Sequence, residues 1–143
     1  MAQADYILGL DYGEKRIGVA IAHVVARLPR PLITLSNAPS VVAEIQKLVD
    51  REGVQLIVIG LPRSMDGQVH AQGERAQRFA AELSEHVTVP VDFADETLTS
   101  VQAEQILTER AGGKPIPKEA IDSMSAALIL ERYFEDHQVE QGA

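Results

Sequence analysis

The stretch Tyr6-Ile-Leu-Gly-Leu-Asp-Tyr-Gly-Glu-Lys-Arg-Ile-Gly-Val-Ala-Ile-Ala22 contains two apolar runs separated by a short polar turn. Tyr6 to Tyr12 and Arg16 to Ala22 are each long enough for one strand, and Gly13 to Lys15 is a turn of the length that joins antiparallel neighbours. A third strand-like run, Pro31 to Leu35, follows a loop flanked by proline. The first forty residues are therefore predicted to form an antiparallel meander.

The apolar spacing changes after Ser40. Apolar residues then recur at helical intervals up to Gly53, and Val54 to Ile59 is a nearly continuous apolar run, which is typical of a strand buried on both faces. The elements expected after it are a helix around Phe79, a strand over Val89–Ala94, a helix from about Thr99 and a final helix over Lys118–Asp136. This order predicts an α/β fold with a mixed five-stranded sheet, three antiparallel strands then two parallel ones, and helices on both faces.

Composition narrows the class of protein. A length of 143 residues, 45% of them hydrophobic, suits a single domain over residues 1–143. Cysteine is absent, which excludes disulfides and thiolate metal sites and fits a reducing compartment. No secretory signal or apolar run of membrane-spanning length is present, so we expect a cytoplasmic protein without membrane contact.

The charge balance argues against a protein that coats nucleic acid through bulk electrostatics, because the net charge is -8. Basic residues nevertheless gather in two places, Glu14 to Arg30 and Arg110 to Lys118. Either cluster can equally be an ordinary solvated face. A local basic rim is therefore possible within an acidic molecule.

Three acids occupy positions where a folded chain rarely places a carboxylate without a counter-charge. Asp11 ends the first apolar run, Glu96 follows the last predicted strand, and Asp122 lies on the apolar stripe of the final helix. Ligands of such sheets gather at the carboxyl ends of strands. Repulsion among these acids is relieved most simply by a divalent cation. We therefore predict a site for one or two Mg²⁺ or Mn²⁺ ions that supports phosphodiester hydrolysis by water.

Each acid also has a simpler interpretation. Asp11 can start a turn with Gly13, and Asp122 can be a second-turn acid favoured by the helix dipole. Asp122 can also form a salt bridge with a nearby cation, the candidates being Lys15, Arg16 and Lys118. Asp95 and Glu96 can be a solvated acidic pair at a strand-to-helix turn. Strand alternation places only one of the two on the face of interest; we choose Glu96, and Asp95 would replace it if a bulge shifts the register.

Four motifs in order resemble those of a known family. They are Gly9-Leu-Asp-Tyr-Gly-Glu-Lys-Arg-Ile-Gly-Val-Ala20, Val58-Ile-Gly-Leu-Pro-Arg-Ser-Met-Asp-Gly67, Asp95-Glu-Thr-Leu-Thr99 and Ile121-Asp-Ser-Met-Ser-Ala-Ala127. With them the chain resembles the YqgF family, RuvC-like bacterial proteins of the ribonuclease H-like superfamily, described as Holliday junction resolvases and as pre-16S rRNA nucleases. The resemblance runs from about Leu8 to Phe134. It implies a ribonuclease H-like fold with Asp11, Glu96 and Asp122 as catalytic acids.

The chain departs from the family pattern at two positions. Thr97 stands where family members commonly have arginine, so one basic contact to substrate is absent or supplied elsewhere, and Ser64 stands where asparagine is common. Neither change affects a proposed metal ligand.

Candidate substrate contacts lie near the acids in sequence. Gly60 and Gly67 would let the loop backbone approach a phosphodiester, with Ser64 as a hydrogen-bond donor, although the same residues are good turn formers. The cations expected to grip flanking phosphates are Lys15, Arg16, Lys114 and Lys118. The expected partner is nucleic acid, and both a monomer and a homodimer are compatible with the sequence.

The sequence thus predicts a metal-dependent nuclease, an endonuclease or an exonuclease, acting on the 16S rRNA precursor or on branched DNA. One alternative is a non-catalytic nucleic-acid or ribosome-binding adaptor, because fold alone does not decide function. A less favoured alternative is an ATPase of the actin and sugar-kinase type, whose phosphate motif is similar. Such enzymes clamp nucleotide between two domains, and this chain has the length of one.

Overall fold

The computed structural model describes residues 5–62, 71–96 and 99–137. Its strands are β1 (Tyr6–Tyr12), β2 (Arg16–His23), β3 (Arg30–Ser36), β4 (Val54–Leu61) and β5 (Val91–Asp95). Its helices are α1 (Val41–Glu52), α2 (Ala71–His86), α3 (Thr99–Ala111) and α4 (Lys118–Asp136). The order of elements predicted from the sequence is confirmed.

The five strands form one mixed sheet in the order β3-β2-β1-β4-β5. β1 pairs antiparallel with β2, and β2 with β3, whereas β4 pairs parallel with β1 and with β5. The predicted mixed sheet is therefore confirmed. Because β1 and β4 run parallel and β5 continues the series, the carboxyl ends of these three strands meet at one edge of the sheet.

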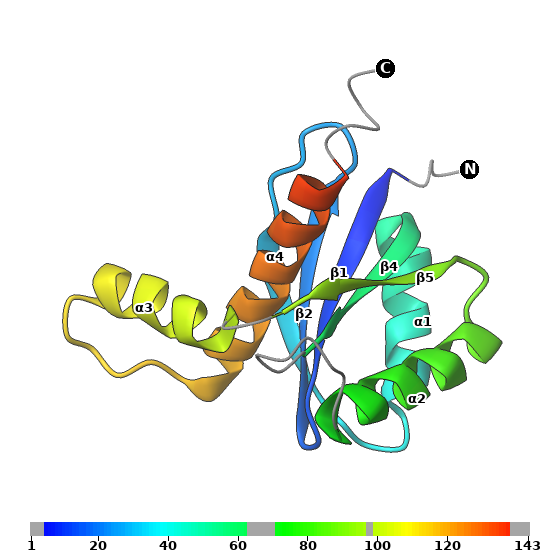
Figure 1. The fold of residues 1–143 in the computed structure, drawn as a ribbon, viewed down its shortest axis with the longest axis horizontal. Helices are drawn as coiled ribbons and strands as arrows, with labels where there is room; N and C mark the ends of the chain where they lie inside the picture. The colour runs from blue at the N-terminus through cyan, green and yellow to red at the C-terminus, as the bar shows by residue number, and fades with distance from the viewer. Residues whose placement is uncertain (1–4, 63–70, 97–98, 138–143) are drawn as a thin grey trace.

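Helices cover both faces of the sheet (Figure 1). Residues such as Leu8, Leu10 and Ile59 pack against α1 and α2 on one face. On the other face Ala20 and Val58 pack with residues of α3 and α4. Alternation along β1 therefore sends Leu8 and Leu10 to the first face, and it leaves Gly9 and Asp11 for the face that α4 covers.

α4 lies along the sheet, whereas α3 projects away from it and packs against α4 (Figure 1). The side chain of Ala103 in α3 is fully buried in that contact. Within the described residues, no helix is long and apolar enough to cross a membrane.

Candidate active site

Two glycines let the backbone of α4 approach the sheet closely. A Cβ atom on Gly18 would collide with the backbone carbonyl of Asp122 and would lie 2.8 Å from the nitrogen of Ser123. A Cβ atom on Gly9 would lie 2.6 Å from Cγ of Leu130. Interior strand glycines of this kind mark a close backbone approach. The first half of α4 therefore lies directly on β2.

This approach places Asp122 near Asp11. Gly18 is the antiparallel partner of Asp11 in the β1–β2 register, so the backbone of Asp122 lies over the strand next to Asp11. The charge of Asp122 acts on Asp11, since it contributes to raising the pKa of the Asp11 carboxyl. Two of the three predicted acids therefore interact electrostatically.

Glu96 reaches Asp11 across β4. A Cβ atom on Gly60 would lie 2.6 Å from Oε2 of Glu96, so the glycine leaves the space that the Glu96 carboxyl occupies. The Asp11 and Glu96 carboxyl groups lie close enough for a hydrogen bond, which affects the pKa of both. The Thr99 hydroxyl donates to the backbone carbonyl of Glu96 at 3.1 Å, which fixes the chain where β5 turns into α3. Asp11 and Glu96 thus form a carboxyl pair over Gly60.

A proton held between the Asp11 and Glu96 carboxyl groups relieves their mutual repulsion. Burial, the charge of Asp11, the hydrogen bond to Asp11 and the charge of Asp95 together raise the pKa of Glu96 to about 10. Burial raises the pKa of Asp11 to about 6, against the hydrogen bond from Glu96 and with a contribution from Asp122. Near neutral pH Glu96 is therefore the donor and Asp11 the acceptor, and the pair carries one negative charge.

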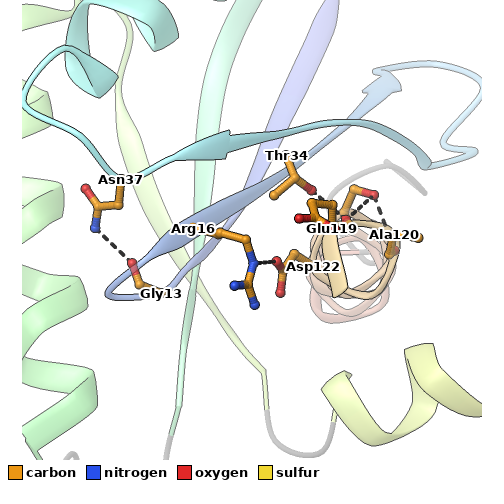
Figure 2. A network of polar contacts seen from close by, with 8 residues as sticks. Gly13, Arg16, Thr34, Asn37, Glu119, Ala120 and Asp122 are labelled. Carbon is orange, nitrogen blue, oxygen red and sulfur yellow. Dashed lines mark hydrogen bonds and ion pairs between the residues drawn. The ribbon is translucent and has the colours of Figure 1, made fainter. Parts of the chain in front are cut away.

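Asp122 is held by Arg16 (Figure 2). The Nε–H of Arg16 donates to Oδ2 of Asp122 at 2.6 Å, and this contact raises the pKa of the Arg16 guanidinium. The first turn of α4 is tied to β3 because the Thr34 hydroxyl donates to the carbonyl of Glu119 at 2.6 Å. One of the three salt bridges considered from the sequence is therefore present.

The orientation of Asp122 toward Arg16 affects the predicted metal cluster. Among the residues that the structure describes, no group of three His, Cys, Asp or Glu side chains is gathered closely enough to hold a metal ion. Asp11 and Glu96 are in contact, and Asp122 lies beside them with its carboxylate directed to Arg16.

Asp95 has different partners from Glu96. It forms an ion pair with Arg132 of α4 at 3.4 Å. Asp92, near the other end of β5, accepts a hydrogen bond from the Tyr133 hydroxyl at 3.1 Å. The structure therefore directs Glu96, rather than Asp95, to Asp11.

The predicted substrate contacts lie at different distances from the acids. Lys15 is exposed in the turn between β1 and β2, and Lys118 is exposed at the start of α4, one helical turn before Asp122. Lys114 belongs to the connection between α3 and α4. Figure 1 shows that this connection lies away from the sheet. Arg16 lies at the acids themselves.

Other predicted contacts lie elsewhere. Gly60 lies within β4, where it packs against Glu96 and Ile129. Ser64 and Gly67 fall outside the described residues, as does Thr97.

Sequence reasoning missed the positioning roles of Gly18 and Thr99. The available signal was the presence of glycine inside otherwise apolar strands, at Gly9, Gly18 and Gly60, all on the face that α4 covers. No sequence pattern indicated the Arg132 contact to Asp95.

Comparison with known proteins identifies the family. The family described as "RuvX: Holliday junction resolvase" matches residues 5–136. The chain belongs to the RuvX family. The resemblance drawn from the four motifs is thereby confirmed.

Curated relatives of this RuvX chain carry a nuclease name. A protein of Chloroflexus aggregans named "Putative pre-16S rRNA nuclease" is 46% identical over 132 residues, covering 90% of this chain and 92% of its own. A protein of the same name from Thermosynechococcus vestitus is 37% identical over 131 residues, covering 90% and 87%. Both relatives match 90% of the chain, about the same extent as the family model.

Solved structures support the fold of this RuvX chain. T. thermophilus RuvC in complex with a Holliday junction substrate superimposes with a TM-score of 0.59 at 15% sequence identity, covering 94% of this chain and 96% of that one. The predicted ribonuclease H-like fold is confirmed by this likeness.

Proposed function

We propose that this RuvX chain is a divalent-metal-dependent nuclease that hydrolyses phosphodiester bonds in structured RNA, with the 16S rRNA precursor as its leading substrate. The observation that carries the proposal is the Asp11–Glu96 carboxyl pair, formed at the meeting strand ends with Asp122 beside it. Buried carboxylates that share a proton are expensive to maintain for stability alone, and perturbed pairs of this kind cluster at functional sites. The names of the curated relatives supply the substrate class.

The acids fit a hard divalent cation. All donors are carboxylate oxygens, which Mg²⁺ and Mn²⁺ prefer. Oε2 of Glu96 is buried and has no hydrogen-bond partner in the described part of the chain. Asp11 and Glu96, joined by Asp122, would hold one or two ions. Bound there, the metal would activate water and stabilise the charge on the leaving oxygen.

Residues around the acids hold them in position for metal binding and supply the cations for phosphate binding. Asp11 is held by the β1 ladder, and Glu96 is held by Gly60 behind its carboxyl and by Thr99 on its backbone. Glu96 must lose its proton to act as a ligand, which the nearby positive charge of a cation favours. Arg16, with Lys15 and Lys118, would contact phosphates on either side of the cut.

A second candidate substrate is the four-way DNA junction. It is favoured by the description of the family and by the likeness of fold to RuvC. Symmetric cutting of a junction requires two such sites, so this activity would need a homodimer, whereas trimming an RNA precursor would not.

The test compares both substrates in one assay. Purified protein is incubated with an end-labelled 16S precursor fragment and with a labelled four-way junction, in Mg²⁺, in Mn²⁺ or in EDTA. Cleavage should require the metal, and Asp11→Asn should abolish it while the thermal melt stays cooperative. Asp50→Asn, which removes an exposed carboxylate from α1 on the opposite face, should cleave normally. Cleavage by Asp11→Asn at the wild-type rate would contradict the proposal.

A further inference from the structure

The ion pair between Arg16 and Asp122 joins two groups that the proposed function uses for different ligands. Asp122 would bind the metal, and Arg16 would bind a phosphate. Their side chains are 33% and 21% exposed, respectively, so the pair lies at the surface of the site rather than sealed in the core. Both ligands can therefore reach it.

Arg16 engages Asp122 with only part of its guanidinium. The contact runs through Nε, from which the dashed line to Asp122 starts in Figure 2. The two terminal nitrogens are not the donors of this hydrogen bond, and the charge of Glu119 also acts on the guanidinium. A guanidinium binds phosphate through such terminal donors in a bidentate contact. Arg16 can thus begin to bind a phosphate before it leaves Asp122.

Arg16 and a metal ion compete for the same carboxylate. The guanidinium occupies Oδ2 of Asp122, and its positive charge lies beside the place where a cation would bind. The competition weakens when a phosphate binds Arg16, because the phosphate charge offsets that of the guanidinium and supplies it with other acceptors. Asp122 then becomes available to the metal.

We propose that Arg16 couples the two ligands, so that phosphate binding at Arg16 strengthens metal binding at Asp122 and metal binding strengthens phosphate binding in return. Because coupling between binding sites is reciprocal, both effects have the same size, typically about 5-fold to 150-fold. The site would assemble fully only on a nucleic acid. This inference rests on the proposed function and makes Arg16 a positioning residue as well as a substrate contact.

Metal binding without nucleic acid gives the first test. Mn²⁺ is titrated calorimetrically into the full-length wild type, Arg16→Gln and Arg75→Gln. Arg75→Gln is the matched control, since it breaks the ion pair between α2 and Glu14 in the β1–β2 turn. We expect Arg16→Gln to bind Mn²⁺ about tenfold more tightly than wild type, within the range of such couplings, and Arg75→Gln to match wild type. Unchanged or weaker binding by Arg16→Gln would overturn the coupling.

Nucleic-acid binding in EDTA gives the second test, because no cleavage occurs without metal. Fluorescence anisotropy measures the affinity for a labelled structured RNA hairpin of wild type, Asp122→Asn, Arg16→Gln and the double variant. Asp122→Asn frees Arg16 and should bind the RNA several-fold more tightly, a gain of the size seen in such couplings. The gain should disappear in the Arg16→Gln background. An equal gain in that background would mean a simple charge effect and would reject the coupling.

The two proposals fail in distinguishable ways. Wild-type protein that neither binds Mn²⁺ nor cleaves contradicts the proposed function and the coupling together. Wild-type protein that cleaves with Mn²⁺, with the same Mn²⁺ affinity in Arg16→Gln, contradicts the coupling alone. If Arg16→Gln does not fold by its thermal melt, Arg16→Lys replaces it, and a smaller gain in Mn²⁺ affinity is expected because the single ammonium competes less well for Asp122.

Discussion

The backbone of Asp122 lies directly against Gly18, with no room for even a methyl group between them. Because Gly18 is the register partner of Asp11, this one contact determines how near the α4 acid lies to the β1 acid. The spacing of the candidate site is therefore set by the packing of a helix on a strand, and glycine is needed for that packing.

Gly18→Ala should be strongly destabilising. The new methyl group would press on backbone atoms of α4, which cannot rotate away, so we expect a loss of about 3 kcal/mol or more in the free energy of unfolding. Urea denaturation measures it. Gly112→Ala is the comparison, because that glycine has a φ of 59° and nothing within 4 Å of an added Cβ. It should cost only about 1 kcal/mol from backbone strain. A Gly18 variant as stable as the Gly112 variant would contradict the packing argument.

Gly60→Ala should damage the site more than the fold. Its methyl group would meet the ends of two side chains, Glu96 and Ile129, which can shift. We expect a loss of stability of about 1–2 kcal/mol together with a large loss of Mn²⁺ affinity, because the Glu96 carboxyl is displaced from Asp11. Melting and Mn²⁺ titration on the same preparation separate the two effects. Ile129→Val should lower stability and leave Mn²⁺ affinity unchanged.

The acid pair predicts how stability depends on pH in EDTA. Folding raises the pKa of Glu96 to about 10 and that of Asp11 to about 6, so the folded state holds protons that the unfolded state releases. The carboxyl pair should contribute its full stabilisation below about pH 4, the pKa of such carboxyls in the unfolded chain. This contribution should be lost as the pH rises from about 4 toward 10. Glu96→Gln should remove most of this decline above pH 6. A wild-type slope retained in Glu96→Gln would show that other groups cause it.

Comparing Asp95→Asn with Glu96→Gln should show which of these two neighbouring acids is the metal ligand. Asp95 forms a partly exposed ion pair with Arg132. Loss of this ion pair should lower the free energy of unfolding by at most about 1 kcal/mol. Cleavage and Mn²⁺ binding should persist in Asp95→Asn and vanish in Glu96→Gln. The reverse pattern in the cleavage assay would assign the ligand to Asp95.

The strands and helices were predictable because their patterns are local. The apolar run over Tyr6–Tyr12 and the helical spacing over Lys118–Asp136 predicted those two elements with the bounds that the structure has. Topology then placed Asp11 and Glu96 at the same edge of the sheet, because parallel strands share their carboxyl ends. Those steps depend only on the spacing of apolar residues and on the rules that govern how strands and helices connect.

The partners of the acids were not predictable in the same way. Asp122 could pair with any of three cations by sequence, and only the contact of α4 with Gly18 selects Arg16. The proton shared by Asp11 and Glu96 depends on burial and on an atomic contact, which no spacing in the sequence encodes. The expectation that a cation relieves the repulsion was therefore incomplete, since a proton and a guanidinium already relieve it within the chain.

The most direct test of the account is a crystal of the protein soaked in Mn²⁺ together with a short nucleic acid, measured at the manganese absorption edge. The account predicts anomalous density coordinated by carboxylate oxygens of Asp11, Glu96 and Asp122, with Arg16 on a phosphate. Density placed away from Asp11 and Glu96, or none at all with Asp122 still bound to Arg16, would contradict it.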